Sequence, residues 1–192
     1  MSKINRETVV AEALDLLDEV GLDAVSTRAL ARRLGVEQPS LYWHFRKKED
    51  LLTAMSEAAM APHATALLPS AGEDWQNWFA ENSRSLRRTL LMRRDGARLH
   101  AGSFPGEADL QRITHKLKFL TAAGVPEGHA RMAMLASGRY TVGCVLEEQA
   151  QLHRSSGVAL AAAEDHVDHE AAFEAGLAFM VTGVADHVVR GS

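Results

Sequence analysis

The fold of this chain is decided by residues 26–45, which read STRALARRLGVEQPSLYWHF. Ser26 suits the N-cap of a short helix that ends at Gly35, and Pro39 suits the first turn of the next helix. Two short helices joined by a tight turn that contains glycine match the helix-turn-helix motif. The second helix of this motif enters the major groove of DNA with its N-terminal residues facing the bases. Residues 26–45 therefore predict a DNA-binding element.

The candidate base-reading side chains lie around the start of the second helix. The Gln38 amide can pair with adenine, the Ser40 hydroxyl can bond to more than one base, and Pro39 can contact a thymine methyl group. Arg28, in the first turn of the preceding helix, can reach a guanine or a phosphate. The full set of predicted DNA contacts is Thr27, Arg28, Gln38, Pro39, Ser40, Tyr42, Trp43, His44 and Lys48.

The aromatic residues of this stretch have core packing as an alternative role. For Phe45, core packing and DNA contact are equally good explanations of the aromatic side chain. For Tyr42, core packing is the weaker explanation. For Trp43 we expect the ring to pack against the N-terminal helices and the indole N–H to point outward.

Charge is unevenly distributed along the chain. The 192 residues carry a formal net charge of −4, which alone counts against a nucleic-acid partner. Residues 28–48, however, hold six basic side chains and one acidic one, a local charge of +5 that leaves −9 on the rest. A basic patch on an acidic body is typical of a small surface that binds polyanions. A solvated helix face is the alternative interpretation.

Composition excludes several classes of protein. Hydrophobic residues make up 46% and charged residues 24%, which is ordinary for a globular protein. Apolar runs are far shorter than a membrane span requires, and the polar N-terminus lacks the apolar core of a secretion signal. The single cysteine, Cys144, excludes an intramolecular disulfide, fits a reducing compartment and is interpreted as a small hydrophobe. We predict a cytoplasmic, nucleoid-associated protein with no membrane partner.

Apolar residues recur at helical spacing, and strand-like alternation is nearly absent, so we predict an all-α fold. Asn5 and Gly21 delimit the first helix, and a long helix runs from about Asp74 to a loop at 101–106. Later helices cover about 108–122, 126–152 and 169–189, with 154–168 ambiguous. The predicted organisation is a three-helix helix-turn-helix DNA-binding head at 1–46 and a larger effector-binding and dimerisation body at 47–192. Residues 47–63 form the connecting helix, which Pro62 ends or kinks.

Two helical faces of the body carry further information. Asn82 interrupts an apolar stripe that includes Phe79 and Leu86, so its amide needs a polar partner, from the chain itself or from a ligand. Small residues such as Gly176 lie beside Phe173 and Leu177 in the last helix. This face fits a partner subunit, with ordinary intrachain core as the alternative.

At the level of residues, the chain closely resembles the tetracycline repressor (TetR) family. The resemblance rests on residues 26–45, on Arg94-Asp95-Gly96-Ala97, His100 and Pro105, and on residues 141–149, and it covers roughly the first 150 residues. It implies a homodimer with two DNA-binding heads on an all-helical ligand-binding body. It also implies that a small-molecule effector releases the protein from a palindromic DNA operator.

The resemblance also implies an effector site. Family positions that match His100 and Glu147 serve a Mg²⁺ ion chelated by a tetracycline, with the Glu acting through water from the other subunit. Such an ion keeps several waters and takes few protein ligands. The metal residues carried over are His100 and Glu147, and the effector contacts are Asn82, Leu86, His100, Ser103, Phe104, Pro105, Lys116 and Arg139.

This chain departs from the family pattern at several of those positions. The pattern expects His at Ala64, Phe at Leu86, Arg at Phe104, Gln at Lys116 and His at Arg139. The effector is therefore either a relative of tetracycline or an unrelated compound. Lys116 and Arg139 would suit an anionic ligand, and snorkelling of both side chains to solvent is the favoured alternative.

Two other classes of function compete with a ligand-responsive repressor. One is a helical metal-dependent enzyme, suggested by nine histidines and by the run DHVDHE at 165–170. The order of that run matches neither zinc-protease pattern, and no P-loop or G-x-S-x-G is present, so we predict that the protein is not an enzyme. The other class is a constitutive DNA binder without an effector, against which the long body with its polar interruptions argues.

Overall fold

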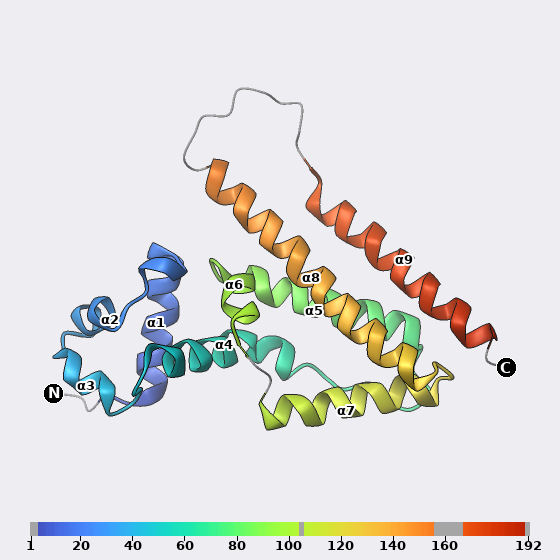
Figure 1. Cartoon of the computed structure of the whole chain (residues 1–192), viewed down its shortest axis with the longest axis horizontal. Coiled ribbons are helices and arrows are strands. Elements are labelled where there is room, and N and C mark those ends of the chain that lie inside the picture. The colour runs from blue at the N-terminus through green and yellow to red at the C-terminus, as the bar shows by residue number, and fades with distance from the viewer. Residues whose placement is uncertain (1–3, 104–105, 156–166, 191–192) are drawn as a thin grey trace. The chain divides into compact units, whose positions relative to one another are not determined.

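The computed structural model describes residues 4–103, 106–155 and 167–190, and these parts contain helices and no strand, which confirms the all-α fold (Figure 1). A 3-10 turn, η1 (Leu22–Ala24), follows the first helix. The α-helices are α1 (Arg6–Val20), α2 (Thr27–Leu34), α3 (Gln38–Tyr42), α4 (Lys48–Ala64), α5 (Trp75–Leu91), α6 (Gly96–Ala101), α7 (Glu107–Ala122), α8 (Glu127–Ser155) and α9 (His169–Arg190).

The chain forms two compact units. The N-terminal unit comprises residues 1–63 and 89–104, and the C-terminal unit comprises 64–88 and 105–192. This division differs from the boundary at 46/47 because Leu51 and Met55 of α4 and Leu99 of α6 share one core with α1, α2 and α3. The functional division into a head at 1–46 and a body at 47–192 stays a prediction.

The helix boundaries of the N-terminal unit follow from local capping. The Asn5 side chain accepts a hydrogen bond from the Thr8 amide at 2.7 Å, and Ser26 accepts one from the Ala29 amide at 3.2 Å. Gly35 ends α2 in the left-handed region with φ of 65°, which glycine adopts without steric cost. These caps satisfy backbone groups that helix ends leave unpaired, and they confirm the predicted turn between α2 and α3.

Three expectations about helix limits need correction. The helix that begins around Pro39, expected to run to about His44, is α3, which ends at Tyr42 and has Glu37 as its N-cap. Pro62 lies inside α4, which continues for only two more residues. The long helix expected from Asp74 to the loop at 101 is divided into α5 and α6, because Asp95 adopts a left-handed φ of 56° that no α-helix accommodates.

The core of the C-terminal unit joins α5, α7, α8 and α9. Trp78 packs edge-on against Phe119 with ring centroids 5.1 Å apart. Phe173 and Leu177 of α9 are fully buried in the same cluster, so they belong to the intrachain core. Helices α8 and α9 lie side by side (Figure 1).

Candidate functional site

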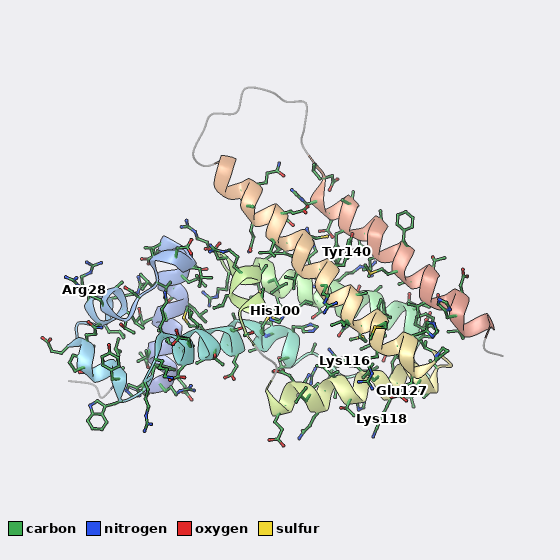
Figure 2. All side chains as sticks on the ribbon, viewed as in Figure 1. Arg28, His100, Lys116, Lys118, Glu127 and Tyr140 are labelled. Atoms are coloured by element: carbon green, nitrogen blue, oxygen red, sulfur yellow. The ribbon has the colours of Figure 1, made fainter. Side chains whose placement is uncertain are left out.

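The N-terminal end of α3 presents the predicted DNA contacts. The Gln38 side-chain amide donates to the Thr27 hydroxyl at 3.0 Å and to the Tyr42 hydroxyl at 3.3 Å, so one polar group joins α2 to both ends of α3. Arg28, which follows Thr27 in the first turn of α2, is exposed (Figure 2). The remaining predicted contacts are also accessible: Pro39, Ser40, Tyr42, Trp43 and Lys48 are exposed, and His44 is half-buried.

The aromatic residues of this stretch divide between surface and core. Phe45 is buried, and the Arg6 guanidinium lies 4.8 Å from its ring centroid. Trp43 is 90% exposed, so the expectation that its ring packs against the N-terminal helices is wrong. Helix α3 ends before Trp43, and the residue follows on the outer side of the unit. An indole this exposed is available to a partner molecule.

One member of the basic patch serves the fold. Arg33 donates to Glu12 at 2.8 Å and to Glu19 at 2.7 Å, both on α1, and these carboxylates raise the pKa of its guanidinium. Its charge is therefore compensated locally. The other basic side chains of residues 28–48 are exposed, and they are Arg28, Arg32, Arg46, Lys47 and Lys48.

The turn before α6 is attached to the end of α1 by polar contacts. The buried Asp95 carboxylate accepts from the Leu22 amide at 2.8 Å, and Arg98 pairs with Asp23 at 2.8 Å. Arg93 pairs with Asp18 at 2.6 Å. Sequence reasoning quoted this segment only for its resemblance and assigned none of these contacts, because each joins residues about 75 positions apart. They fix α6 within the N-terminal unit.

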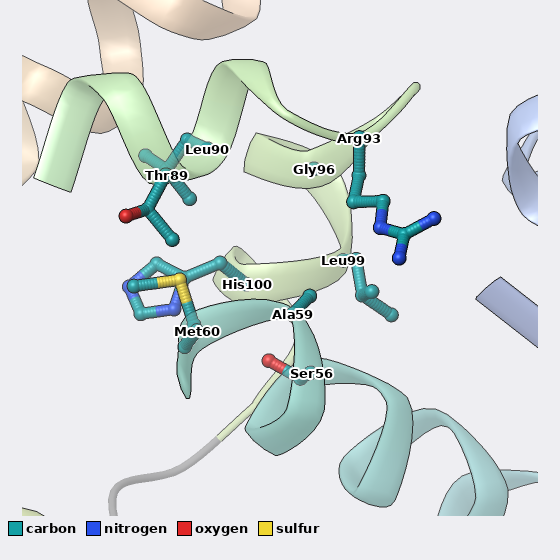
Figure 3. A pocket seen from close by; sticks show the side chains of 9 residues that line it. All are labelled: Ser56, Ala59, Met60, Thr89, Leu90, Arg93, Gly96, Leu99 and His100. Atoms are coloured by element: carbon teal, nitrogen blue, oxygen red, sulfur yellow. The ribbon is translucent and has the colours of Figure 1, made fainter. Parts of the chain in front are cut away.

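His100 lines a small hollow within the N-terminal unit (Figure 3). Met60 of α4 lines the same hollow as His100. The Ser56 hydroxyl of α4 donates to the Ser103 hydroxyl at 2.9 Å, and Ser103 donates in turn to the His100 carbonyl at 2.8 Å. The hollow is lined by Ser56, Ala59, Met60, Thr89, Leu90, Arg93, Gly96, Leu99 and His100. The structure therefore brings His100 and Ser103 together against α4.

Asn82 and Lys116 form a second pair, in the C-terminal unit. The Lys116 ammonium donates to the Asn82 side-chain oxygen at 2.6 Å, which supplies the polar partner that Asn82 requires. Lys116 is only 8% exposed, and this burial, with a smaller contribution from the Arg112 charge, lowers its pKa to about 8 (Figure 2). The snorkelling expected for Lys116 is therefore wrong. Arg139 is exposed, as snorkelling requires.

The other carried-over effector residues are spread over the two units. Leu86 is buried and Glu147 is exposed, and both belong to the C-terminal unit, whereas His100 and Ser103 belong to the N-terminal unit. Phe104 and Pro105 lie outside the described residues. The structure thus assembles two local pairs, His100 with Ser103 and Asn82 with Lys116.

The donor set allows a test of the implied Mg²⁺ ion. Among the described residues, no three histidine, cysteine, aspartate or glutamate side chains are grouped closely enough to hold a metal. Residues 165 and 166 of the run DHVDHE lie outside the described residues. As a single protein ligand, the His100 imidazole fits an ion that takes most of its ligands from water and from a chelating molecule, which is the coordination Mg²⁺ prefers.

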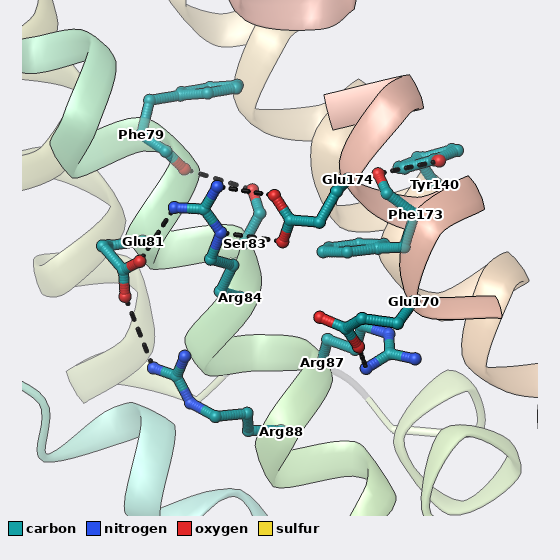
Figure 4. A network of polar contacts seen from close by, with 10 residues as sticks. All are labelled: Phe79, Glu81, Ser83, Arg84, Arg87, Arg88, Tyr140, Glu170, Phe173 and Glu174. Carbon is teal, nitrogen blue, oxygen red and sulfur yellow. Dashed lines mark hydrogen bonds and ion pairs between the residues drawn. The ribbon is translucent and has the colours of Figure 1, made fainter. Parts of the chain in front are cut away.

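Arginines of α5 pair with carboxylates of α9 (Figure 4), and one of them also pairs with α8. Arg87 is buried and forms ion pairs with Glu170 and with Glu148, the latter at 2.7 Å. Its guanidinium lies 5.3 Å from the Phe173 ring centroid. Arg84 donates to Glu174 at 2.8 Å and lowers the pKa of that carboxyl. Sequence reasoning missed this network, because its partners lie on separate helices and show no common spacing.

Beyond this network, α8 and α9 leave apolar side chains uncovered. Phe179 is 76% exposed, and Met132 and Leu135 are also exposed. In α9 the exposed small residues include Ala171, Ala172, Ala175 and Ala178. No described helix is both long enough and apolar enough to cross a membrane.

Comparison with known proteins places these features in a family context. A model described as bacterial regulatory proteins, tetR family, matches residues 9–55, and a model described as tetracyclin repressor-like, C-terminal domain, matches residues 68–163. Tetracycline repressor protein class A from transposon 1721 of Escherichia coli is 45% identical over 199 residues, which cover 96% of this chain and 92% of that protein.

Two solved structures extend the similarity to three dimensions. A TetR-family transcriptional regulator from Streptomyces coelicolor is 66% identical, with a TM-score of 0.75 over 96% of this chain and 99% of that chain. TetR(class A) in complex with 5a,6-anhydrotetracycline and magnesium is 43% identical, with a TM-score of 0.81 over 94% of this chain and 97% of that chain.

Proposed function

The chain belongs to the TetR family of bacterial regulatory proteins, and we propose that it is a homodimeric transcriptional repressor that leaves a palindromic operator when a small effector binds. The observation that carries this proposal is the polar group of Gln38, Thr27 and Tyr42, together with the exposed Arg28, the residue after Thr27. A preorganised amide at the start of the recognition helix α3 and an exposed guanidinium in the first turn of α2 are suited to reading base edges.

Side-chain chemistry and position determine which of the proposed DNA contacts are made to bases and which to the backbone. Gln38, Pro39, Ser40 and Arg28 contact bases, because they lie in the first turns of α3 and α2. Thr27, Tyr42, Trp43, His44 and Lys48 fix the position of the protein through phosphates and sugars. In a dimer, the two recognition helices would lie about 34 Å apart, one turn of DNA, so that each reads one half of a palindrome.

The uncovered faces of α8 and α9 support the proposed dimer. Phe179, Met132 and Leu135 expose apolar surface, and small alanine residues on α9 permit close approach of another helix. Burial of this surface against a second copy is favourable, at about 25 cal/mol for each Å² of apolar area.

For the effector we propose a tetracycline-like compound bound together with Mg²⁺. The named relatives are tetracycline repressors, and one related structure holds 5a,6-anhydrotetracycline and magnesium. His100 would hold the ion directly and Glu147 would hold it through water from the other subunit, and the ion would supply positive charge to the oxygens of the effector. Ser103 would orient its hydroxyl toward the same end, while Asn82, Leu86, Phe104, Pro105, Lys116 and Arg139 would contact the effector.

One observation favours a second candidate, an unrelated anionic effector. Lys116 places a buried ammonium beside Asn82 where the family pattern has a neutral amide. An anionic group would pair with this ammonium and offset the cost of its burial. In either case the role is regulatory, with no catalytic activity, and we propose that the protein acts in the cytoplasm at the nucleoid.

The proposal is tested in two steps with the full chain. Selection from a random DNA library should yield a palindromic site, and affinity for that site should fall steeply as salt rises. Salt-dependent binding without any preferred sequence would refute the repressor. Tetracycline is then titrated into the complex with and without Mg²⁺. Release that needs both components supports the chelated effector, whereas retention on the operator in every combination favours the second candidate.

A further inference from the structure

Two histidines from different helices lie face to face in the C-terminal unit, where α8 begins and α9 ends. His129 is in the first turn of α8, and His187 is in the last turn of α9. Their ring centroids are 4.1 Å apart, and the ring planes differ by 26°. Both residues are exposed, so that dissolved ions reach the two rings from solvent. The proposed effector contacts include neither residue.

The residues beside these histidines fix the position of both helices. Ala130, which follows His129, is fully buried, and Val184 and Val188 of α9 pack against the same core. The turn before α8 also contacts the end of α9, because a Cβ atom at Gly124 would lie 3.3 Å from a methyl carbon of Val188. The two imidazoles therefore project from backbones that the core holds in place, which favours a precise binding site.

An imidazole pair at this separation is suited to a transition-metal ion. In a zinc site each imidazole nitrogen lies about 2.0–2.1 Å from the ion, so two such nitrogens lie at most about 4.2 Å apart. The ring centroids of His129 and His187 are already at that separation, and exposed side chains can rotate to turn one nitrogen of each ring toward a common ion. Imidazole is a good ligand of Ni²⁺, Cu²⁺ and Zn²⁺, whereas Mg²⁺ prefers oxygen.

We propose that His129 and His187 form a binding site for a divalent transition-metal ion, which joins the start of α8 to the end of α9. Water completes the coordination, because the pair supplies only two ligands. The site uses other residues than the effector's Mg²⁺, which we assign to His100 and Glu147, and it does not depend on the proposed function. The simpler alternative is that the two rings only pack against each other. Their replacement would then change stability and leave metal binding as it is.

The test measures binding of Zn²⁺ and Ni²⁺ to the full chain, without an affinity tag, by isothermal titration calorimetry in excess Mg²⁺. His129→Gln and His187→Gln should each weaken binding at least about tenfold, since loss even of a group that only supports a metal ligand costs about 10–100-fold. His115→Gln is the matched control, because the His115 ring bonds to the Pro69 carbonyl at 3.1 Å, and it should keep the affinity within about twofold. Unchanged affinity in His129→Gln or His187→Gln, or an equal loss in His115→Gln, would overturn the proposal.

A second measurement locates the ion in the unmodified protein and needs no variant to fold. The NMR signals of the histidine ring nitrogens are followed as Zn²⁺ is added. The signals of His129 and His187 should shift together, at the same Zn²⁺ concentration. In His187→Gln, the His129 signal should require at least about tenfold more Zn²⁺ for the same shift. Shifts confined to His100, or an unmoved pair, would show that the two rings only stack and would overturn the proposal.

Discussion

Tyr140 of α8 and Gly176 of α9 are in direct contact, so close that a Cβ atom at position 176 would lie 2.1 Å from the tyrosine hydroxyl. The hydroxyl donates to the backbone carbonyls of Ala172 and Phe173 at 3.0 and 3.1 Å, and the Tyr140 ring stacks on Phe173. Gly176 is required because the tyrosine occupies the space of its side chain. The glycine interpreted from the sequence as part of a packing face thus packs within its own chain.

The first prediction concerns this contact. Gly176→Ala should lower the free energy of unfolding by about 1–3 kcal/mol, because the added methyl group forces Tyr140 away from its two carbonyl acceptors. Urea denaturation followed by circular dichroism measures the change. Gly128→Ala is the matched control, since a Cβ there meets no heavy atom within 4 Å among the described residues. Equal stability of the two variants would contradict the contact.

The second prediction concerns the buried guanidinium of Arg87. Replacement by Ala leaves the Glu148 and Glu170 carboxylates without their cation; because both remain accessible to water, with side chains 20% and 64% exposed, the loss of these charged hydrogen bonds costs about 1.5–3 kcal/mol. We expect a clear loss of thermal stability. Arg88→Ala serves as the control, because Arg88 is exposed and lies 3.6 Å from Glu81, a pair that contributes little. A similar melting temperature for both variants would argue against the network.

The third prediction is a pH dependence that arises from Lys116. Its pKa is about 8 in the folded chain against an ordinary value of 10.5, so the unfolded chain binds more protons between these values. Stability due to this group therefore rises with pH from about 8 to about 10.5, and is constant below that range. The unmodified protein should gain on the order of 2–3 kcal/mol relative to Lys116→Met across the range.

Urea denaturation at pH 7.5, 9 and 10.5 measures this difference. Lys118→Met provides the comparison, because Lys118 is exposed on the same helix (Figure 2). Parallel stability curves for the unmodified protein and Lys116→Met would mean that Lys116 is hydrated in solution.

The fourth prediction separates reading of the bases from attraction to the phosphates. Arg28→Ala and Gln38→Ala should each reduce discrimination against altered operators by about 1–3 kcal/mol and leave the dimer intact in sedimentation. Lys48→Ala should instead weaken binding to all sequences alike. It should also reduce the magnitude of the slope of log affinity against log salt concentration by about one, because one phosphate contact is lost. Unchanged sequence preference in both Arg28→Ala and Gln38→Ala would place the reading helix elsewhere.

Much of the helix-turn-helix element could be predicted because its determinants are local. The Asn5 and Ser26 caps each act within three residues, and Gly35 ends α2 through its own backbone freedom. The residues proposed to contact DNA were also found in one continuous stretch. Their joint role in binding stays a prediction.

The determinants of the body lie far apart in the chain, and prediction from the sequence was weaker there. At the break, the Asp95 carboxylate accepts a hydrogen bond from the Leu22 amide, 73 residues away. The residues around Asp95 in the sequence do not indicate this partner. The environment of Lys116 depends on Asn82, 34 residues earlier, and neither spacing nor hydropathy indicated that a lysine would be buried. The predicted role of the pair at an effector is likewise untested.

The sequence by itself determined the all-α class, the limits of most helices and the position of the DNA-binding element, because periodicity and capping act over one or two helical turns. Tertiary structure alone decided which polar residues are paired in the interior. It brought Ser56 to Ser103, Lys116 to Asn82 and Tyr140 to Gly176, in each case from two different helices or from a helix and a loop. Burial and hydrogen bonding depend on neighbours in space, and these neighbours are set only when the helices pack.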